Sequence, residues 1–186
     1  MPPFAAGLLR GLDSYVPAGL RDRESLLSLR DFVRRVPGAF SRSNAEGHVT
    51  ASAVVARSDA SEFLLVWHRK LDRWLQPGGH LEPEDASVFA AALREAREET
   101  GVETFAFPIG QEIFDVDVHA IPAFGADPAH LHYDIRHLFT SDAFAAPLPP
   151  GVAWFSLEEA VAAGIDESLT RALRKAALHV AACSDP

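Results

Sequence analysis

Residues 78–102 read GGHLEPEDASVFAAALREAREETGV, and they are the most informative stretch of this sequence. Glu95, Glu98 and Glu99 stand three and four residues apart, so on a helix they share one face. Repulsion between like charges at these spacings costs an isolated helix roughly 0.2–0.5 kcal/mol per pair. A hard divalent cation such as Mg²⁺ takes oxygen ligands and would turn that repulsion into a binding site. The spacing therefore predicts a metal-binding helix face.

The residues around the three glutamates support a helix with a defined beginning and end. Residues 74–76 read as a strand, and residues 88–96 place apolar side chains along one side of a helix. Arg94 lies one turn before Glu98 and can brace it, and Gly101 is suited to end the helix. The alternative is a solvated acidic helix face, the usual fate of such a run. The context of strand, glycine-rich turn and amphipathic helix favours the metal site over that alternative.

This stretch resembles the box of the Nudix hydrolases, G-x5-E-x7-R-E-U-x-E-E-x-G-U, in which U is a bulky apolar residue. The matching positions are Gly79, Arg94-Glu95, Glu98-Glu99 and Gly101-Val102. Two features depart from the pattern. Asp85 stands where the first glutamate is expected, and eight rather than seven residues separate it from Arg94; Ala96 also replaces a larger apolar residue. One extra residue in the loop before the helix accounts for the spacing and leaves the acidic face intact.

The resemblance implies a metal-dependent hydrolase that cleaves the pyrophosphate linkage of a nucleoside diphosphate joined to another moiety, with Mg²⁺ or Mn²⁺ as cofactor. The implied metal ligands are the carbonyl oxygen of Gly78 and the carboxylates of Glu95, Glu98 and Glu99. The implied chemistry is attack of an activated water on phosphorus, with Glu98 or Glu99 as general base.

The resemblance also assigns supporting roles within the box. It implies that Arg94 takes part in catalysis by orienting the glutamates and that Asp85 positions Arg94 from the loop. Gly79 and Gly101 are then the structural glycines of the box. The loop at residues 148–154 contains no acid, so Asp134 is the best candidate if a further carboxylate is needed.

A second stretch, residues 129–136, alternates polar and apolar side chains as a half-buried strand does. We expect its polar face to contact the substrate, because arginine suits phosphate recognition and histidine donates to phosphate or binds metal. The residues of that face are His130, His132, Asp134 and Arg136, with His80 in the box loop as a further substrate-binding candidate. A transition-metal site built from the histidines and the aspartate is the minor alternative.

Other polar residues receive a structural interpretation. Asp115 and Asp117 alternate in a neighbouring strand and are expected on its solvated outer face. His48 and His68 lie at the ends of predicted strands and are expected to be structural or exposed.

Composition limits the class of protein. Of 186 residues, 48% are hydrophobic and 23% charged, which is typical of a globular protein. A net charge of −9 argues against a duplex nucleic acid as partner and leaves a small nucleotide as substrate. The single cysteine, Cys183, excludes an intrachain disulfide and favours a reducing compartment. No basic leader and no apolar run of membrane-spanning length is present, so the sequence predicts a cytoplasmic protein without membrane contact.

The order of elements predicts the fold class α/β. We expect residues 1–46 to form an N-terminal helical extension and residues 47–186 to form a Nudix domain, an α/β/α sandwich around a mixed sheet. The expected strands are 50–56, 63–68, 103–107, 113–121 and 130–140, and the expected helices after the box are 157–163 and 167–182. The extension is a candidate for homodimer formation or for capping the active site.

The sequence also allows three alternatives to the hydrolase. A Nudix-fold sensor that binds a nucleotide without cutting it fits the altered box, but such proteins usually lose helix glutamates, and none is lost here. A resemblance to the isopentenyl diphosphate isomerase branch would imply a cysteine and a glutamate in the pocket. Cys183 lies far from the box in the sequence. An adaptor protein would explain the extension but not the box. Among substrates, an NDP-sugar or an ADP-ribose type is favoured by the polar strand.

Overall fold

The computed structural model describes residues 2–123, 125, 128–142 and 148–184. Groups of helices and groups of strands follow one another along the chain. The elements are α1 (Ala5–Ser14), α2 (Leu20–Arg35), β1 (Gly47–Ala56), β2 (Phe63–His68), β3 (Arg73–Leu75), β4 (Gly78–His80), α3 (Val88–Thr100), β5 (Asp115–Ile121), β6 (His130–Thr140), β7 (Val152–Phe155), α4 (Leu157–Ala162) and α5 (Glu167–Ser184).

The strands form one mixed sheet in the order β3-β2-β1-β6-β5, with β4 paired to β1 and β7 paired to β2. The long strands β1 and β6 run parallel over ten residue pairs, and every other pairing is antiparallel. This register sets His48 beside His132 and Thr50 beside Asp134. The central strand pair therefore joins polar residues that lie far apart in the sequence.

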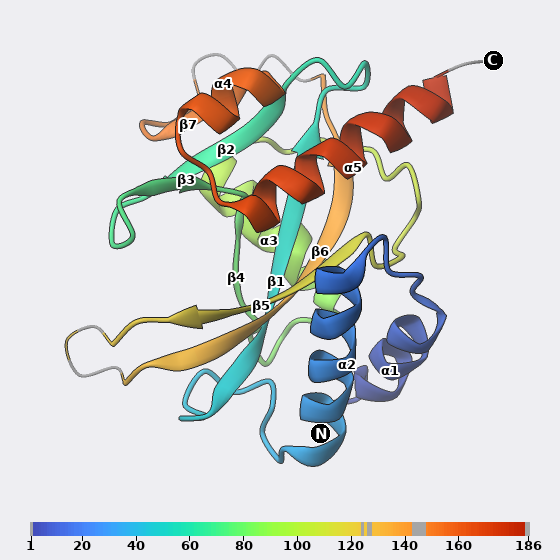
Figure 1. Ribbon diagram of the computed structural model, residues 1–186, viewed down its shortest axis with the longest axis vertical. Helices are drawn as coiled ribbons and strands as arrows, with labels where there is room; N and C mark the ends of the chain where they lie inside the picture. Colours follow the sequence, from blue (N-terminus) through green and yellow to red (C-terminus); the bar gives the residue numbers. More distant parts are fainter. Residues whose placement is uncertain (1, 124, 126–127, 143–147, 185–186) are drawn as a thin grey trace.

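Alternation along β1 divides the core into two layers. Val49, Ala51 and Ala53 face a cluster shared with α1, α2 and α3, whereas Val54 faces a cluster shared with α4 and α5. Figure 1 shows α5 and α3 on opposite sides of β1. The predicted α/β/α sandwich around a mixed sheet is confirmed.

The N-terminal helices belong to the same core as the sheet. Leu12, Leu29 and Phe32 are buried in the α3-side cluster, and the ring of Phe32 stacks on Tyr133 with the ring centroids 3.9 Å apart. Leu27, in contrast, is 54% exposed, because it falls on the outer side of α2. The N-terminal segment thus contains two helices, as predicted, and α2 packs beside β5 (Figure 1). A domain boundary at residue 47 stays a prediction.

One local prediction was wrong. Residues 103–107 do not form a strand; Ala106 makes only an isolated bridge to Thr140, because the segment leaves the sheet edge on both sides of it. Residues 154 and 155 end β7, which pairs with β2, and the expected helix at 157–163 follows directly as α4. Among the described residues, no helix is long and apolar enough to cross a membrane.

Candidate active site

The helix α3 begins and ends where its sequence predicts. Ser87 caps its first turn, with its Oγ accepting a hydrogen bond from the Ala90 N–H at 3.0 Å. Gly101 ends it in the left-handed conformation, with φ of 68°. Ala92 and Ala96 are buried against the sheet, so the glutamates on the other side of the helix point away from the core. These caps fix the position of the acidic face relative to β4.

Arg94 is the centre of the polar contacts around this helix. Its guanidinium donates to the Asp85 carboxylate at 2.9 and 3.2 Å, to Glu95 Oε1 at 3.0 Å and to Glu98 Oε2 at 3.2 Å. It also donates to the backbone oxygen of His80 at 3.0 Å. Arg94 therefore ties the box loop and β4 to the acidic face of α3.

Asp85 occupies the loop position from which it holds Arg94, in spite of the additional residue in the box. Its Oδ2 also accepts the Glu82 N–H at 2.8 Å, which closes a turn within the loop. Burial alone would raise the pKa of Asp85, but the hydrogen bonds from Arg94 and from the Glu82 backbone outweigh it and hold the pKa below the usual value. The extra residue is absorbed between Asp85 and the start of α3.

Two of the three glutamates face a cavity of about 590 Å³. Glu95 and Glu99 line this cavity, whereas the side chain of Glu98 is 59% exposed outside its lining. Burial raises the pKa of Glu99 to about 7, against the lowering effect of the Gly78 N–H, which donates to Glu99 Oε2 at 2.9 Å. Repulsion by Glu95 and Glu98 contributes to this rise. Crowded, partly desolvated carboxylate oxygens are the donor set that Mg²⁺ or Mn²⁺ prefers, so these residues fit such an ion.

The two glycines of β4, Gly78 and Gly79, are needed because the chain passes close to its neighbours. A Cβ atom built on Gly79 would lie 2.5 Å from Glu95 Oε1, and one on Gly78 would lie 2.7 Å from the Ala51 carbonyl oxygen. Both approaches are closer than real Cβ contacts allow. Glycine at these positions lets β4 lie against both β1 and the acidic face of α3.

The cavity brings together most of the residues that the sequence assigned to substrate. Besides the two glutamates, its lining includes His80, His130, His132 and Asp134. Sequence reasoning missed Arg42 and Lys70, which also line it and carry positive charge suited to phosphate. They lie in loops before β1 and after β2, where no periodicity marks them. Gln76, which lies between β3 and β4, also lines the cavity and was missed.

Arg136 corrects the expectation that it contacts the substrate. Its side chain is 3% exposed and does not line the cavity. The guanidinium bonds to Asp115 Oδ2 at 3.1 Å, Asp134 Oδ2 at 3.1 Å and Ser168 Oγ at 2.9 Å. The polar face of β6 thus turns from cavity to protein interior along the strand, because α5 covers its far end.

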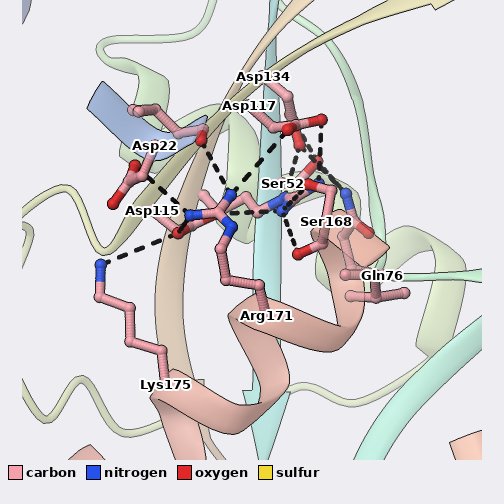
Figure 2. A network of polar contacts seen from close by, with 12 residues as sticks. Asp22, Ser52, Gln76, Asp115, Asp117, Asp134, Ser168, Arg171 and Lys175 are labelled. Atoms are coloured by element: carbon pink, nitrogen blue, oxygen red, sulfur yellow. Dashed lines mark hydrogen bonds and ion pairs between the residues drawn. The ribbon is translucent and has the colours of Figure 1, made fainter. Parts of the chain in front are cut away.

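Asp115 and Asp117 were expected on a solvated face, and this was wrong. Their exposures are 0% and 1%. Figure 2 shows Arg171 and Lys175 reaching from α5 toward Asp115, and Arg171 Nη1 lies 2.7 Å from Asp115 Oδ1. Asp22 from α2 lies 3.5 Å from the same Arg171 nitrogen. These contacts link α2, β5 and α5 through buried charges.

Asp134 connects the buried charges to the cavity. Its Oδ1 accepts hydrogen bonds from Thr50 and Ser52, and its Oδ2 from Gln76 and Arg136, all between 2.8 and 3.1 Å. A carboxylate with four donors is fixed in place. Its acceptor positions are therefore taken by protein donors, and the carboxylate does not reorient.

The comparisons with known proteins agree with this geometry. Residues 47–176 match the family model of the NUDIX domain, which is more than half of the chain, so the protein belongs to the Nudix family. The expected class of enzyme, a Nudix pyrophosphohydrolase, is thereby confirmed at the level of the family.

Solved structures show the same fold. The crystal structure of C. elegans Ap4A hydrolase is 21% identical, with a TM-score of 0.51 over 68% of this chain and 93% of that one. The structure of the E. coli dihydroneopterin triphosphate pyrophosphohydrolase is 16% identical, with a TM-score of 0.52 over 70% of this chain and 94% of that one. No curated protein sequence matches the chain significantly.

Proposed function

We propose that this protein hydrolyses the pyrophosphate linkage of a nucleoside diphosphate joined to another moiety. The observation that carries the proposal is the acidic face of α3, where Glu95 and Glu99 line a cavity and Arg94 holds Glu95 and Glu98 in place. A volume of about 590 Å³ suits a small molecule, since ligand pockets commonly measure about 300–1,000 Å³. Arg42 and Lys70 in the lining supply the positive charge that a diphosphate needs.

The site residues divide the work as follows. Glu95, Glu98, Glu99 and the Gly78 carbonyl would hold Mg²⁺ or Mn²⁺, which would neutralise the diphosphate and lower the pKa of a water. Arg94 keeps the glutamates oriented, and Asp85 and the His80 carbonyl keep Arg94 oriented. Glu98 or Glu99 accepts the proton from the attacking water. Glu99 has the better position because it lines the cavity, whereas Glu98 does not.

The substrate class we favour is an NDP-sugar or ADP-ribose. The polar face of β6 supports this choice, because His130 and His132 line the cavity and can contact hydroxyl or phosphate groups, with Asp134 beside them in the same wall. Arg136 no longer contributes to that argument. A cytoplasmic location, based on the single cysteine, and a homodimer through residues 1–46 stay proposals from the sequence.

A panel of nucleotides with purified protein and Mg²⁺ or Mn²⁺ tests the proposal. Metal-dependent cleavage of one class should disappear in Glu99→Gln and fall sharply in Glu98→Gln. The matched control is Glu103→Gln, an exposed glutamate just beyond α3, which should keep full activity. Circular dichroism of each variant confirms that the fold is retained.

The second candidate is a nucleotide sensor. It is favoured by two features of the box, namely Asp85 in place of the first glutamate and the extra residue after it. Its signature would be thermal stabilisation by a nucleotide without cleavage of any member of the panel. The retained contact between Arg94 and Asp85 argues for the hydrolase. Full turnover in Glu99→Gln would contradict the hydrolase mechanism.

A further inference from the structure

Three histidines meet in the wall of the cavity. His48 and His132 are direct neighbours on the parallel strands β1 and β6, and His130 lies two residues earlier on the same face of β6. One ring nitrogen of each lies within 4.8 Å of the corresponding nitrogens of the other two. The group contains no carboxylate, so it is distinct in its ligands from the acidic face of α3.

His48 is buried without the hydrogen bonds that its ring requires. It is 2% exposed, and neither Nδ1 nor Nε2 has a hydrogen-bond partner among the described residues. A neutral imidazole carries one N–H donor and one acceptor, and leaving such a group unpaired in the interior costs roughly 1–3 kcal/mol. An occupant that accepts a ring lone pair would offset this cost.

The geometry of the other two histidines suits a shared metal ion. His130 Nε2 and His132 Nε2 lie 3.3 Å apart. With Zn–N bonds of about 2.0–2.1 Å, tetrahedral ligand nitrogens stand about 3.3–3.4 Å from one another. His130 Nδ1 lies 2.8 Å from the carbonyl oxygen of Pro128, which orients the ring so that Nδ1 donates and Nε2 keeps its lone pair. Metal-binding histidines are held in this way by a backbone carbonyl.

We propose that His48, His130 and His132 form a transition-metal site, best suited to Zn²⁺, in the wall of the substrate cavity. Imidazole nitrogen selects zinc and its neighbours over Mg²⁺ or Mn²⁺, which prefer oxygen. Three protein ligands leave a fourth position, and because all three residues line the cavity, that position is open to an anionic oxygen of a bound molecule.

Two further observations support the site. Burial, together with the neighbouring histidines, lowers the pKa of His48 to about 4 and of His132 to about 2, so both rings are neutral and able to bind metal at pH 7. His80 lies next to the group, its ring centroid 4.8 Å from that of His48. The proposal does not depend on the proposed hydrolase, because metal binding is measured without turnover.

The test uses the full chain without an affinity tag, freed of metal by chelation and titrated with Co²⁺ and then Zn²⁺. Visible absorption of nitrogen-bound Co²⁺ should saturate at one equivalent and be displaced by Zn²⁺. Loss of a mere supporting group around a metal ligand costs roughly 10–100-fold in affinity, so His132→Ala should weaken binding by more than about 100-fold. The remote His179→Ala should bind Co²⁺ and Zn²⁺ as the unaltered protein does.

The variants separate the possible outcomes. If His132→Ala does not fold, His130→Ala replaces it, because His130 lies at the beginning of β6; its metal affinity should fall by the same amount. Binding that is lost in Glu99→Gln but kept in both histidine variants would place the ion on the α3 carboxylates and overturn the proposal. Absence of Co²⁺ and Zn²⁺ binding in the unaltered protein would show that the histidines form a metal-free cluster, which also overturns it.

Discussion

The guanidinium of Arg94 lies 2.9 Å from the carboxylate of Asp85, across a loop that carries one residue more than the Nudix box pattern. A shorter acid and a longer loop together keep the contact that the pattern assigns to glutamate. The side chain of Asp85 is 7% exposed, so this ion pair is shielded from water on one side. The contact explains why the altered box leaves α3 and its acidic face in place.

Replacing Asp85 should disturb this arrangement. In Asp85→Ala, Arg94 loses two hydrogen bonds and no longer holds the glutamates in a fixed position. We therefore expect kcat to fall by about 10-fold or more, up to the roughly 100-fold that a misplaced catalytic group can cost. Steady-state kinetics measure the change. Glu84→Ala, an exposed acid in the same loop, is the matched control and should behave as the unaltered protein. Equal activity of the two variants would show that Arg94 does not need Asp85.

Gly79→Ala tests the close approach of β4 to α3. The new Cβ would lie 2.5 Å from Glu95 Oε1, so the Glu95 carboxylate must shift from its present position. We expect metal affinity, measured by calorimetry with Mn²⁺, to fall by at least about 10-fold while the secondary structure is retained. Gly19→Ala is a suitable control, because nothing lies within 4 Å of a Cβ at that position. Unchanged Mn²⁺ binding would argue that Glu95 is not a ligand.

Arg136 should prove to be a stabilising residue. Arg136→Met removes one buried charged partner from both Asp115 and Asp134, and breaking a buried pair costs about 3–5 kcal/mol. Urea unfolding should show this loss, and KM of the protein that remains folded should be nearly unchanged. The exposed Arg174→Met on α5 should have little effect on either quantity. A large rise in KM without loss of stability would restore the substrate-contacting interpretation.

Phe32 tests whether residues 1–46 are part of the core. Phe32→Ala removes the ring that stacks on Tyr133 and leaves a cavity, for which the usual cost is about 3–5 kcal/mol. Leu27→Ala, in the same helix but 54% exposed, should cost less than about 0.5 kcal/mol. Chemical unfolding of both variants gives the comparison. Equal free energies of unfolding for the two variants would indicate that residues 1–46 are an extension outside the core of the domain.

The buried His137 should make the protein sensitive to acid. Burial lowers its pKa to about 4, while a histidine in the unfolded chain titrates near 6.5. Between these pH values the unfolded state binds more protons, so stability is retained above about pH 6.5 and is lost as the pH falls toward 4.

His137→Gln keeps a donor for the Glu112 carbonyl, which His137 Nδ1 contacts at 2.9 Å, but removes the titration. The decrease in unfolding free energy between pH 6.5 and 4 should become smaller by about 1–3 kcal/mol, measured by urea unfolding at several pH values. A pH dependence identical to that of the unaltered protein would show that His137 titrates alike in both states. Replacing His179 in the same way controls for loss of a histidine elsewhere.

Local sequence was enough to predict the box helix and its acids. The spacing of Glu95, Glu98 and Glu99, the ending at Gly101 and the apolar side of α3 all follow from the helical period, which depends only on neighbours within a few residues. The same holds for the alternation in β6, which correctly placed His130 and His132 on one face with Asp134. The mixed sheet also followed from the order of elements.

The tertiary structure alone decided what covers each face. Alternation shows that Arg136 shares a face with Asp134, but only the packing of α5, with Ser168 and Arg171, makes that end of the face buried and leaves the other end open to the cavity. Likewise, His48 meets His132 only because β1 and β6 pair in one register. Periodicity is a local property of the backbone, whereas burial and the meeting of distant side chains depend on long-range packing that no short stretch contains.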